Sequence, residues 1–163
     1  MTVVTVGEGG PGQGFVGECG GDPVLVVGVD GSPASWDAFL WAADQARRAH
    51  GRMIVVFAMP LVDRELAMAF NVPLDYGEVE VARSEMAAKL AAEVARRADE
   101  LGVEASFVAE YGDAAQALAR VAGSTHAGTI AVGRSERTFH RLAGSLDRGL
   151  VLSPQSPVVV VVP

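Results

Sequence analysis

The chain has 163 residues, half of them apolar, and carries 20 acidic against 13 basic side chains for a net charge of −7. That length is typical of one domain with a substantial hydrophobic core. The acidic balance argues against nucleic acid as a partner, because a protein that neutralises phosphates needs a basic face. Cys19 is the only cysteine, which excludes an intrachain disulfide and favours a reducing compartment, the cytoplasm. No apolar run approaches the roughly 20 residues that span a bilayer, so we expect no membrane association.

The first 21 residues differ in composition from the rest. Residues 2–6 followed by residues 7–12 match the Gly-x-Gly-x-x-Gly dinucleotide fingerprint after a strand-like run. That fingerprint works only where a helix follows, with its amino end aimed at the pyrophosphate. Glycines recur as far as Gly21 and make such a helix costly. We therefore interpret residues 1–21 as a flexible Gly-rich tail and residues 22–163 as the folded domain.

Residues 24–29 are a continuous apolar run, typical of a strand that is buried on both faces of a sheet. Ser32 can cap a helix that has Pro33 in its first turn, and Gly51 is expected to stop that helix. Its apolar residues recur on one face, which predicts the buried side: Trp36, Phe39, Leu40 and Ala43.

The remaining chain continues the alternation of strands and helices. Further strands are predicted at residues 53–59, 103–110, 129–132 and 157–162. The clearest helix covers residues 78–101, and its apolar stripe consists of Val79, Ala82, Met86, Leu90, Val94, Ala98 and Leu101. Shorter helices are predicted after Asp113 and over residues 146–152.

Five strands alternating with four helices predict a doubly wound α/β fold, with a five-stranded parallel sheet in the order 3-2-1-4-5 and helices on both faces. Ligands of such sheets bind beyond the carboxyl ends of the strands, where the winding reverses between strands one and four. The residues at that point are Asp30, Gly31 and Ser32 after the first strand, and Gly133 and Arg134 after the fourth.

The segment of residues 133–145 combines glycines with Arg134, Arg137 and Arg141. Glycines let a backbone approach phosphates closely, and the guanidinium groups add positive charge to an otherwise acidic chain. A solvated connection between a strand and a helix fits the same residues equally well. Asp30 likewise fits either a ligand contact or a turn that needs no ligand.

Residues 22–163 resemble the universal stress protein family, an adenine-nucleotide-binding α/β group. The matching segments are residues 27–32, 111–115, 130–134, 144–146 and 156–161. The resemblance implies that Asp30 contacts the nucleoside, that Ala58, Val132 and Gly133 line the adenine pocket, and that Gly144, Ser145 and Leu146 bind phosphate. Together with the strand ends, the candidate nucleotide-binding residues are Asp30, Gly31, Ser32, Ala58, Val132, Gly133, Arg134, Gly144, Ser145 and Leu146.

One departure from the family pattern concerns ATP. Members that bind ATP carry Gly-x-x-Gly, nine residues, then Gly-Ser or Gly-Thr. Here Glu136 replaces the second glycine, and seven residues separate it from Gly144, so the loop is two residues shorter. A carboxylate about 4 Å from a phosphate opposes binding by roughly 1 to 4 kcal/mol. AMP, a cyclic nucleotide or no nucleotide therefore stand as alternatives to ATP.

The last predicted strand indicates a partner. Val158 to Val162 are five consecutive valines at a sheet edge, with no charge to discourage pairing with another chain. The family resemblance implies a homodimer through this strand across a two-fold axis. The alternative is a strand covered by the helices and tail of its own chain.

We expect a cytoplasmic, homodimeric regulatory or protective module in the stress response that binds ATP or another adenine nucleotide, with or without Mg²⁺, and acts on an unknown protein partner. We expect no enzyme activity, with slow ATP hydrolysis as an alternative, and no dedicated metal site. The rival hypothesis is a dimeric protein-interaction module that binds no nucleotide, motivated by Glu136 and the short loop.

Overall fold

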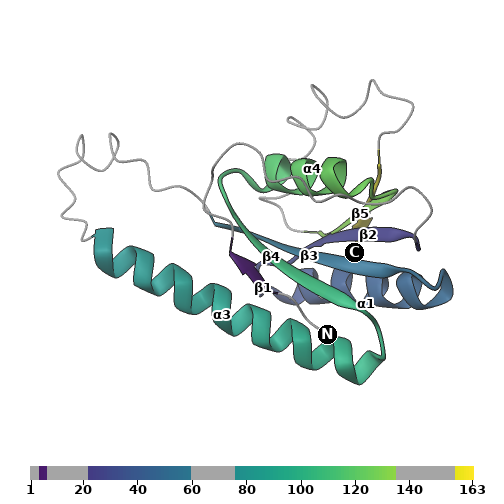
Figure 1. The fold of residues 1–163 in the computed structure, drawn as a ribbon, viewed down its shortest axis with the longest axis horizontal. Helices are drawn as coiled ribbons and strands as arrows, with labels where there is room; N and C mark the ends of the chain where they lie inside the picture. The colour runs from purple at the N-terminus through teal and green to yellow at the C-terminus, as the bar shows by residue number, and fades with distance from the viewer. Residues whose placement is uncertain (1–3, 7–21, 60–75, 135–156) are drawn as a thin grey trace.

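The structure, a computed structural model, describes residues 4–6, 22–59, 76–134 and 157–163 (Figure 1). Within these residues, six parallel strands form one sheet in the order β1-β4-β3-β2-β5-β6. The strands are β1 (Val4–Val6), β2 (Val24–Gly28), β3 (Arg52–Met59), β4 (Ala105–Tyr111), β5 (Thr129–Gly133) and β6 (Val158–Val162). The last five are the strands predicted from the sequence, and their order confirms the predicted 3-2-1-4-5 arrangement.

The first strand, β1, is an addition to that prediction. It pairs in parallel with β4, with Val4 opposite Phe107 and Val6 opposite Ala109. Its three residues belong to the segment that we interpreted as a tail. The rest of that segment, including the Gly-rich fingerprint, lies outside the described residues, so the domain boundary at residue 22 stays a prediction.

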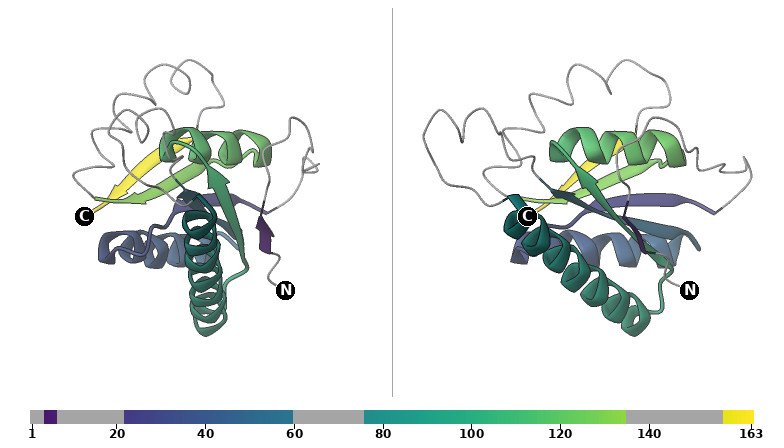
Figure 2. Two further views of the ribbon diagram at one scale, coloured as in Figure 1. Left: turned by 90° about the vertical axis from the view of Figure 1, so that its left-hand side faces the viewer. Right: turned by 60° about the vertical axis from the view of Figure 1, so that its left-hand side comes forward.

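Among the described residues, three helices cover the two faces of the sheet (Figures 1 and 2). Helices α1 (Pro33–Arg48) and α3 (Tyr76–Leu101) pack on one face, and α4 (Ala114–Thr125) packs on the other. Buried strand residues alternate between the two cores, so that Val27 and Val55 face α1 whereas Val26 and Ile54 face α4. The predicted helix over residues 146–152 lies outside the described part of the chain.

The predicted caps of two helices are confirmed. The Ser32 hydroxyl accepts a hydrogen bond from the N–H of Ser35 at 3.2 Å and so begins α1. The Asp113 carboxylate accepts from the N–H groups of Ala115 and Gln116, at 3.0 and 3.3 Å, and begins α4. Both caps satisfy backbone donors that a helix start otherwise leaves without partners.

The carboxyl end of α1 differs in detail from the prediction. The helix ends at Arg48, and His50, rather than Gly51, takes the left-handed conformation, with φ of 52°. Gly51 is needed for another reason, because a Cβ atom there would lie 2.2 Å from the carbonyl oxygen of Pro23. The glycine allows the start of β3 to pass close to the start of β2.

The buried face of α1 was predicted correctly only in part. Phe39 and Ala43 are buried, and Trp36 is partly buried against the core that α1 and α3 share. Leu40 is 46% exposed and does not belong to that core, so its assignment to the buried face was wrong.

The apolar stripe of α3 also continues beyond the core. Leu90 and Val94 are buried, whereas Met86, one turn earlier, is 51% exposed and Ala82 is exposed as well. A helix of 26 residues is about 39 Å long. Figure 1 shows its amino-terminal half extending past the sheet, which explains why that half of the stripe has no strand to cover.

Candidate functional site

A pocket lies beyond the carboxyl ends of β2, β3 and β5, between the first turns of α1 and α4. Its lining residues are Gly28, Val29, Asp30, Ser32, Ser35, Val56, Ala58, Ala114, Leu118, Val132 and Gly133. The cavity volume is about 80 Å³, small beside the roughly 300 Å³ or more of sites that enclose a whole small molecule. The described residues therefore form one part of a binding site of that size.

Half of the ten candidate site residues line this pocket: Asp30, Ser32, Ala58, Val132 and Gly133. The topology brings them together because the strands are parallel and end at the same edge of the sheet. Gly31 and Arg134 flank the pocket in sequence but do not line it. Gly144, Ser145 and Leu146 lie outside the described residues.

Six lining residues were not among the candidates: Gly28, Val29, Ser35, Val56, Ala114 and Leu118. Ala114 and Leu118 belong to α4, which crosses the sheet from β4 toward β5 and places its first turns over the pocket. The signal in the sequence was the segment of residues 111–115, which matches the family, but its polar residues, Tyr111 and Asp113, do not line the pocket.

The loop after β2 holds Asp30 in a defined conformation. One carboxylate oxygen of Asp30 accepts from the N–H of Ser32 at 2.9 Å, and Gly31 between them has φ of 86°, which favours glycine. Burial raises the pKa of the Asp30 carboxyl, but hydrogen bonds from Ser32 and Ser35 outweigh burial and lower that pKa below its ordinary value. The carboxylate is ionised at neutral pH and acts as a hydrogen-bond acceptor only.

Backbone groups of β3 also border the pocket. The last pair between β2 and β3 joins Gly28 and Val56, and the N–H of Val29 donates to the carbonyl of Val56 at 2.9 Å. Alternate residues of a strand direct their backbone groups to the same side. The N–H and C=O of Ala58, two residues on, thus point toward the β2 side, beyond the last β2–β3 pair, where the pocket lies.

Glycines shape the pocket in two different ways. A Cβ atom on Gly133 would lie 2.1 Å from the carbonyl oxygen of Ala34, so this glycine allows the end of β5 to approach the first turn of α1. A Cβ atom on Gly28 would make ordinary contacts, at 3.4 Å to Leu118 and 3.5 Å to Val132. Gly133 is therefore required by packing, whereas the absence of a side chain at Gly28 leaves space in the pocket.

At the starts of α1 and α4, beside the pocket, several backbone N–H groups already have hydrogen-bond acceptors. Ser32 caps α1 and Asp113 caps α4, and Asp30 adds a negative charge beside the start of α1. An anion gains less at a helix start whose donors are occupied by a carboxylate. The described wall of the pocket thus favours an uncharged group with hydrogen-bond donors over a phosphate.

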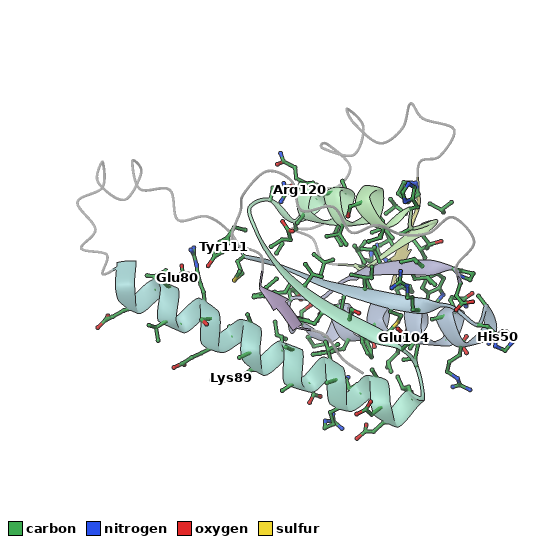
Figure 3. All side chains as sticks on the ribbon, in the orientation of Figure 1. His50, Glu80, Lys89, Glu104, Tyr111 and Arg120 are labelled. Atoms are coloured by element: carbon green, nitrogen blue, oxygen red, sulfur yellow. The ribbon has the colours of Figure 1, made fainter. Side chains whose placement is uncertain are left out.

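A polar cluster borders this region at the carboxyl end of β4. The hydroxyl of Tyr111 donates to the carboxylate of Glu80 on α3 (Figure 3), and Arg120 on α4 pairs with Glu110 at 3.0 Å. Glu110 lies opposite Ala58 in the β3–β4 ladder. The cluster therefore ties the strand end beside the pocket to helices on both faces of the sheet.

The described part of the chain lacks the features of a metal site and of a membrane-spanning segment. It contains no group of three or more His, Cys, Asp or Glu side chains that could hold a metal ion. None of its helices combines the length and the apolar character needed to cross a membrane.

Comparisons with known proteins give the family. A sequence model of the universal stress protein family matches residues 24–162, whereas a comparison with curated proteins finds no match. The fold is similar to that of a universal stress protein family member from Burkholderia pseudomallei, with 22% identity and a TM-score of 0.67 over 86% of this chain and 95% of that one.

Two further structures contain nucleotides. A universal stress protein in complex with cAMP has 18% identity and a TM-score of 0.62, over 87% of this chain and 97% of that one. The universal stress protein from Archaeoglobus fulgidus in complex with dAMP has 19% identity and a TM-score of 0.58, over 87% of this chain and 98% of that one. At these identities the likeness concerns the fold alone. Because the family match spans most of the sequence, the chain belongs to the universal stress protein family.

Proposed function

We propose that the chain binds an adenine nucleotide in this pocket and acts as a cytoplasmic, nucleotide-responsive regulatory or protective module in the stress response. The observation that carries the proposal is the pocket itself, in which an ionised carboxylate and the Ala58 backbone border an apolar slot at the reversal point of the sheet. Relatives of the same fold in complex with cAMP and dAMP support the choice of ligand.

In this proposal the described wall binds the adenosine part. Val56, Leu118 and Val132 offer apolar surfaces to the base. The N–H of Ala58 can donate to N1 of adenine, and the C=O of Ala58 can accept from the N6 amino group. Asp30 accepts hydrogen bonds from the nucleoside, since its negative charge disfavours phosphate.

We assign the phosphate to the residues that follow Gly133. Arg134, which is exposed directly after β5, supplies a positive charge there, and Gly144, Ser145 and Leu146 remain the predicted phosphate ligands. Asp30 is the only carboxylate that lines the pocket within the described residues, so we assign neither a Mg²⁺ site nor a hydrolytic step. ATP turnover that persists in Asp30→Ala would exclude Asp30 from any slow hydrolysis.

Calorimetric titration with adenosine, AMP, cAMP and ATP tests the proposal. We expect measurable binding of adenosine and tighter binding of AMP. Asp30→Asn keeps the side-chain oxygen that accepts from Ser32 but removes the charge, and should weaken AMP about tenfold, since one charged hydrogen bond becomes neutral. The control is Asp44→Asn, at the other end of α1, where Asp44 pairs with Arg48 at 2.8 Å.

Three results would refute the assignment. Absence of binding at millimolar concentration of every ligand would exclude nucleotide binding. Equal losses in Asp30→Asn and Asp44→Asn would show that the effect is not local. A gain of affinity in Asp30→Asn would place the phosphate, rather than the nucleoside, beside Asp30.

The last strand supports a second proposal, a homodimer through β6. This strand is the edge of the sheet opposite β1, and Val158 and Val161 are 64% and 38% exposed. Uncovered apolar edge strands favour pairing with another chain. Light scattering should find a dimer that Val158→Lys dissociates, whereas Val81→Lys, at a position 60% exposed on α3, leaves it intact. A monomeric wild type would exclude the dimer, and a dimer without nucleotide binding would favour the protein-interaction alternative.

A further inference from the structure

We propose that Ser35 is the positioning residue of the pocket: its buried hydroxyl joins the backbone of Asp30 to the first turn of α1 and so holds the Asp30 carboxylate in the orientation that the nucleoside meets. This inference rests on the proposed function, since it concerns how the same pocket is organised. Ser35 was not a candidate from the sequence, and it lines the pocket beside Asp30 and Ser32.

The burial of Ser35 sets it apart. The residue is 4% exposed, and it is the one buried polar residue among those that the structure describes. The other small buried positions on α1 are alanines: Ala38, Ala42, Ala43 and Ala46. A buried hydroxyl costs free energy unless it is fully hydrogen-bonded, so the contacts that it makes account for its place here.

Those contacts join the loop to the helix. The Ser35 hydroxyl accepts from the N–H of Asp30 at 3.3 Å and donates to the carbonyl of Ser32 at 2.8 Å. The N–H of Ser35 donates in turn to the Ser32 hydroxyl at 3.2 Å, and the Asp30 carboxylate accepts from the N–H of Ser32 at 2.9 Å. Asp30, Ser32 and Ser35 therefore form a closed set of hydrogen bonds.

Without the Ser35 hydroxyl, this set of hydrogen bonds is broken at the N–H of Asp30. The Asp30 N–H then loses the partner that holds this residue against α1, and Gly31, with φ of 86°, gives the loop a point about which it can rotate. The carboxylate keeps its hydrogen bond from the N–H of Ser32, but the Asp30 backbone that carries it is no longer fixed to α1. Pre-organised polar groups bind ligands more tightly because no ordering is needed on binding.

The simpler alternative is that Ser35 only stabilises the start of α1. Ser124 provides a matched control, because its hydroxyl also donates to the carbonyl three residues earlier, that of Val121, at 3.1 Å. Ser124 lies near the carboxyl end of α4, whereas the pocket is at the amino end of that helix. Ser124→Ala therefore removes the same type of hydrogen bond away from the pocket.

The binding test is a double-mutant cycle read by AMP affinity. We expect Ser35→Ala to weaken AMP about tenfold and Ser124→Ala less than twofold. In an Asp30→Asn background, Ser35→Ala should weaken AMP by only about twofold, because the group that it positions is already altered. Full additivity of the two substitutions would overturn the proposal. Ser35→Cys, which fills the site with a thiol that forms only weak hydrogen bonds, replaces Ser35→Ala if the alanine variant fails to fold.

A second readout needs no ligand. Carbon-detected NMR titration of the Asp30 carboxyl in the free protein should show that Ser35→Ala raises the pKa of Asp30, whereas Ser124→Ala leaves it unchanged. If the wild type binds no adenine nucleotide, the proposed function fails, but this titration still decides whether Ser35 positions Asp30. An Asp30 titration that is identical in wild type and Ser35→Ala would refute the positioning role.

Discussion

Substitution of Gly133 by alanine tests the close approach of β5 to α1 that shapes the pocket. The new Cβ atom would lie 2.1 Å from the carbonyl oxygen and 2.3 Å from the carbonyl carbon of Ala34. An ordinary contact needs about 3.4 Å, so the strand and the helix must separate by about 1 Å or more. Backbone lies on both sides, and no side-chain rotation relieves the overlap. We expect a loss near the upper end of the range for overpacking, about 3 kcal/mol.

Two other glycines provide matched controls. In Gly28→Ala the Cβ atom meets only the side chains of Leu118 and Val132, at 3.4 and 3.5 Å, so the free energy of unfolding should change by less than about 1 kcal/mol. Gly123→Ala lies inside α4 with nothing within 4 Å of the new atom. Alanine there should stabilise the protein by about 0.5–1 kcal/mol.

Urea unfolding followed by circular dichroism measures the three variants. The expected order of stability is Gly123→Ala, wild type or Gly28→Ala, and last Gly133→Ala, with a thermal midpoint for Gly133→Ala about 6–12 °C below that of the wild type. A Gly133→Ala variant within about 1 kcal/mol of the wild type would refute the close approach of β5 to α1.

Three further substitutions test other local features. Asp113→Ala removes the cap of α4 and should lower the free energy of unfolding by about 1 kcal/mol in urea; no loss would mean that the cap is unimportant. His126→Gly should raise that free energy by about 0.5–1 kcal/mol, because His126 ends α4 with φ of 54°, a conformation that glycine adopts without strain; an unchanged midpoint would contradict this. The pKa of the Asp30 carboxyl is lower in the folded chain than its ordinary 3.8, so its contribution is present at neutral pH and lost as the pH falls below 3.8. The stability difference between wild type and Asp30→Asn should therefore shrink between pH 7 and pH 3, and a constant difference would exclude this linkage.

Five of the six described strands, β2 to β6, and their order were predictable from short apolar or β-branched runs. Strands β2, β3 and β6 are largely apolar, as a parallel sheet covered on both faces requires, whereas Ser106 and Glu110 interrupt β4. The right-handed crossover rule then left few possible orders. The extent of helix burial was not predictable in the same way. Met86 falls on the predicted apolar stripe but is 51% exposed. The amino-terminal half of α3 extends past the sheet (Figure 1). Periodicity gives the direction of a side chain and not the length of the surface opposite it.

The pocket residues likewise divide into those that were predictable from the sequence and those that were not. Asp30 was predictable from the rule that the carboxyl ends of parallel strands form the binding edge, whereas Ala58 was implied only by the family resemblance. Leu118 and Ser35 line the same pocket from helices, and their positions depend on how each helix is rotated over the sheet, which no local pattern records. The sequence left open whether Gly133 admits a ligand or serves a turn, and the structure adds that its approach to Ala34 already requires glycine.

NMR mapping of AMP binding on the isotope-labelled full chain tests the central claim most directly, because it reports where the nucleotide binds as well as whether it binds. The account predicts the largest amide shifts at the pocket, in residues 28–32, Ala58, Ala114 and residues 132–133, with small shifts along the exposed face of α3 around Met86. The Asp30→Asn variant should shift in the same residues at about tenfold higher AMP concentration. Shifts centred on another surface, or no shifts at millimolar AMP, would contradict the account.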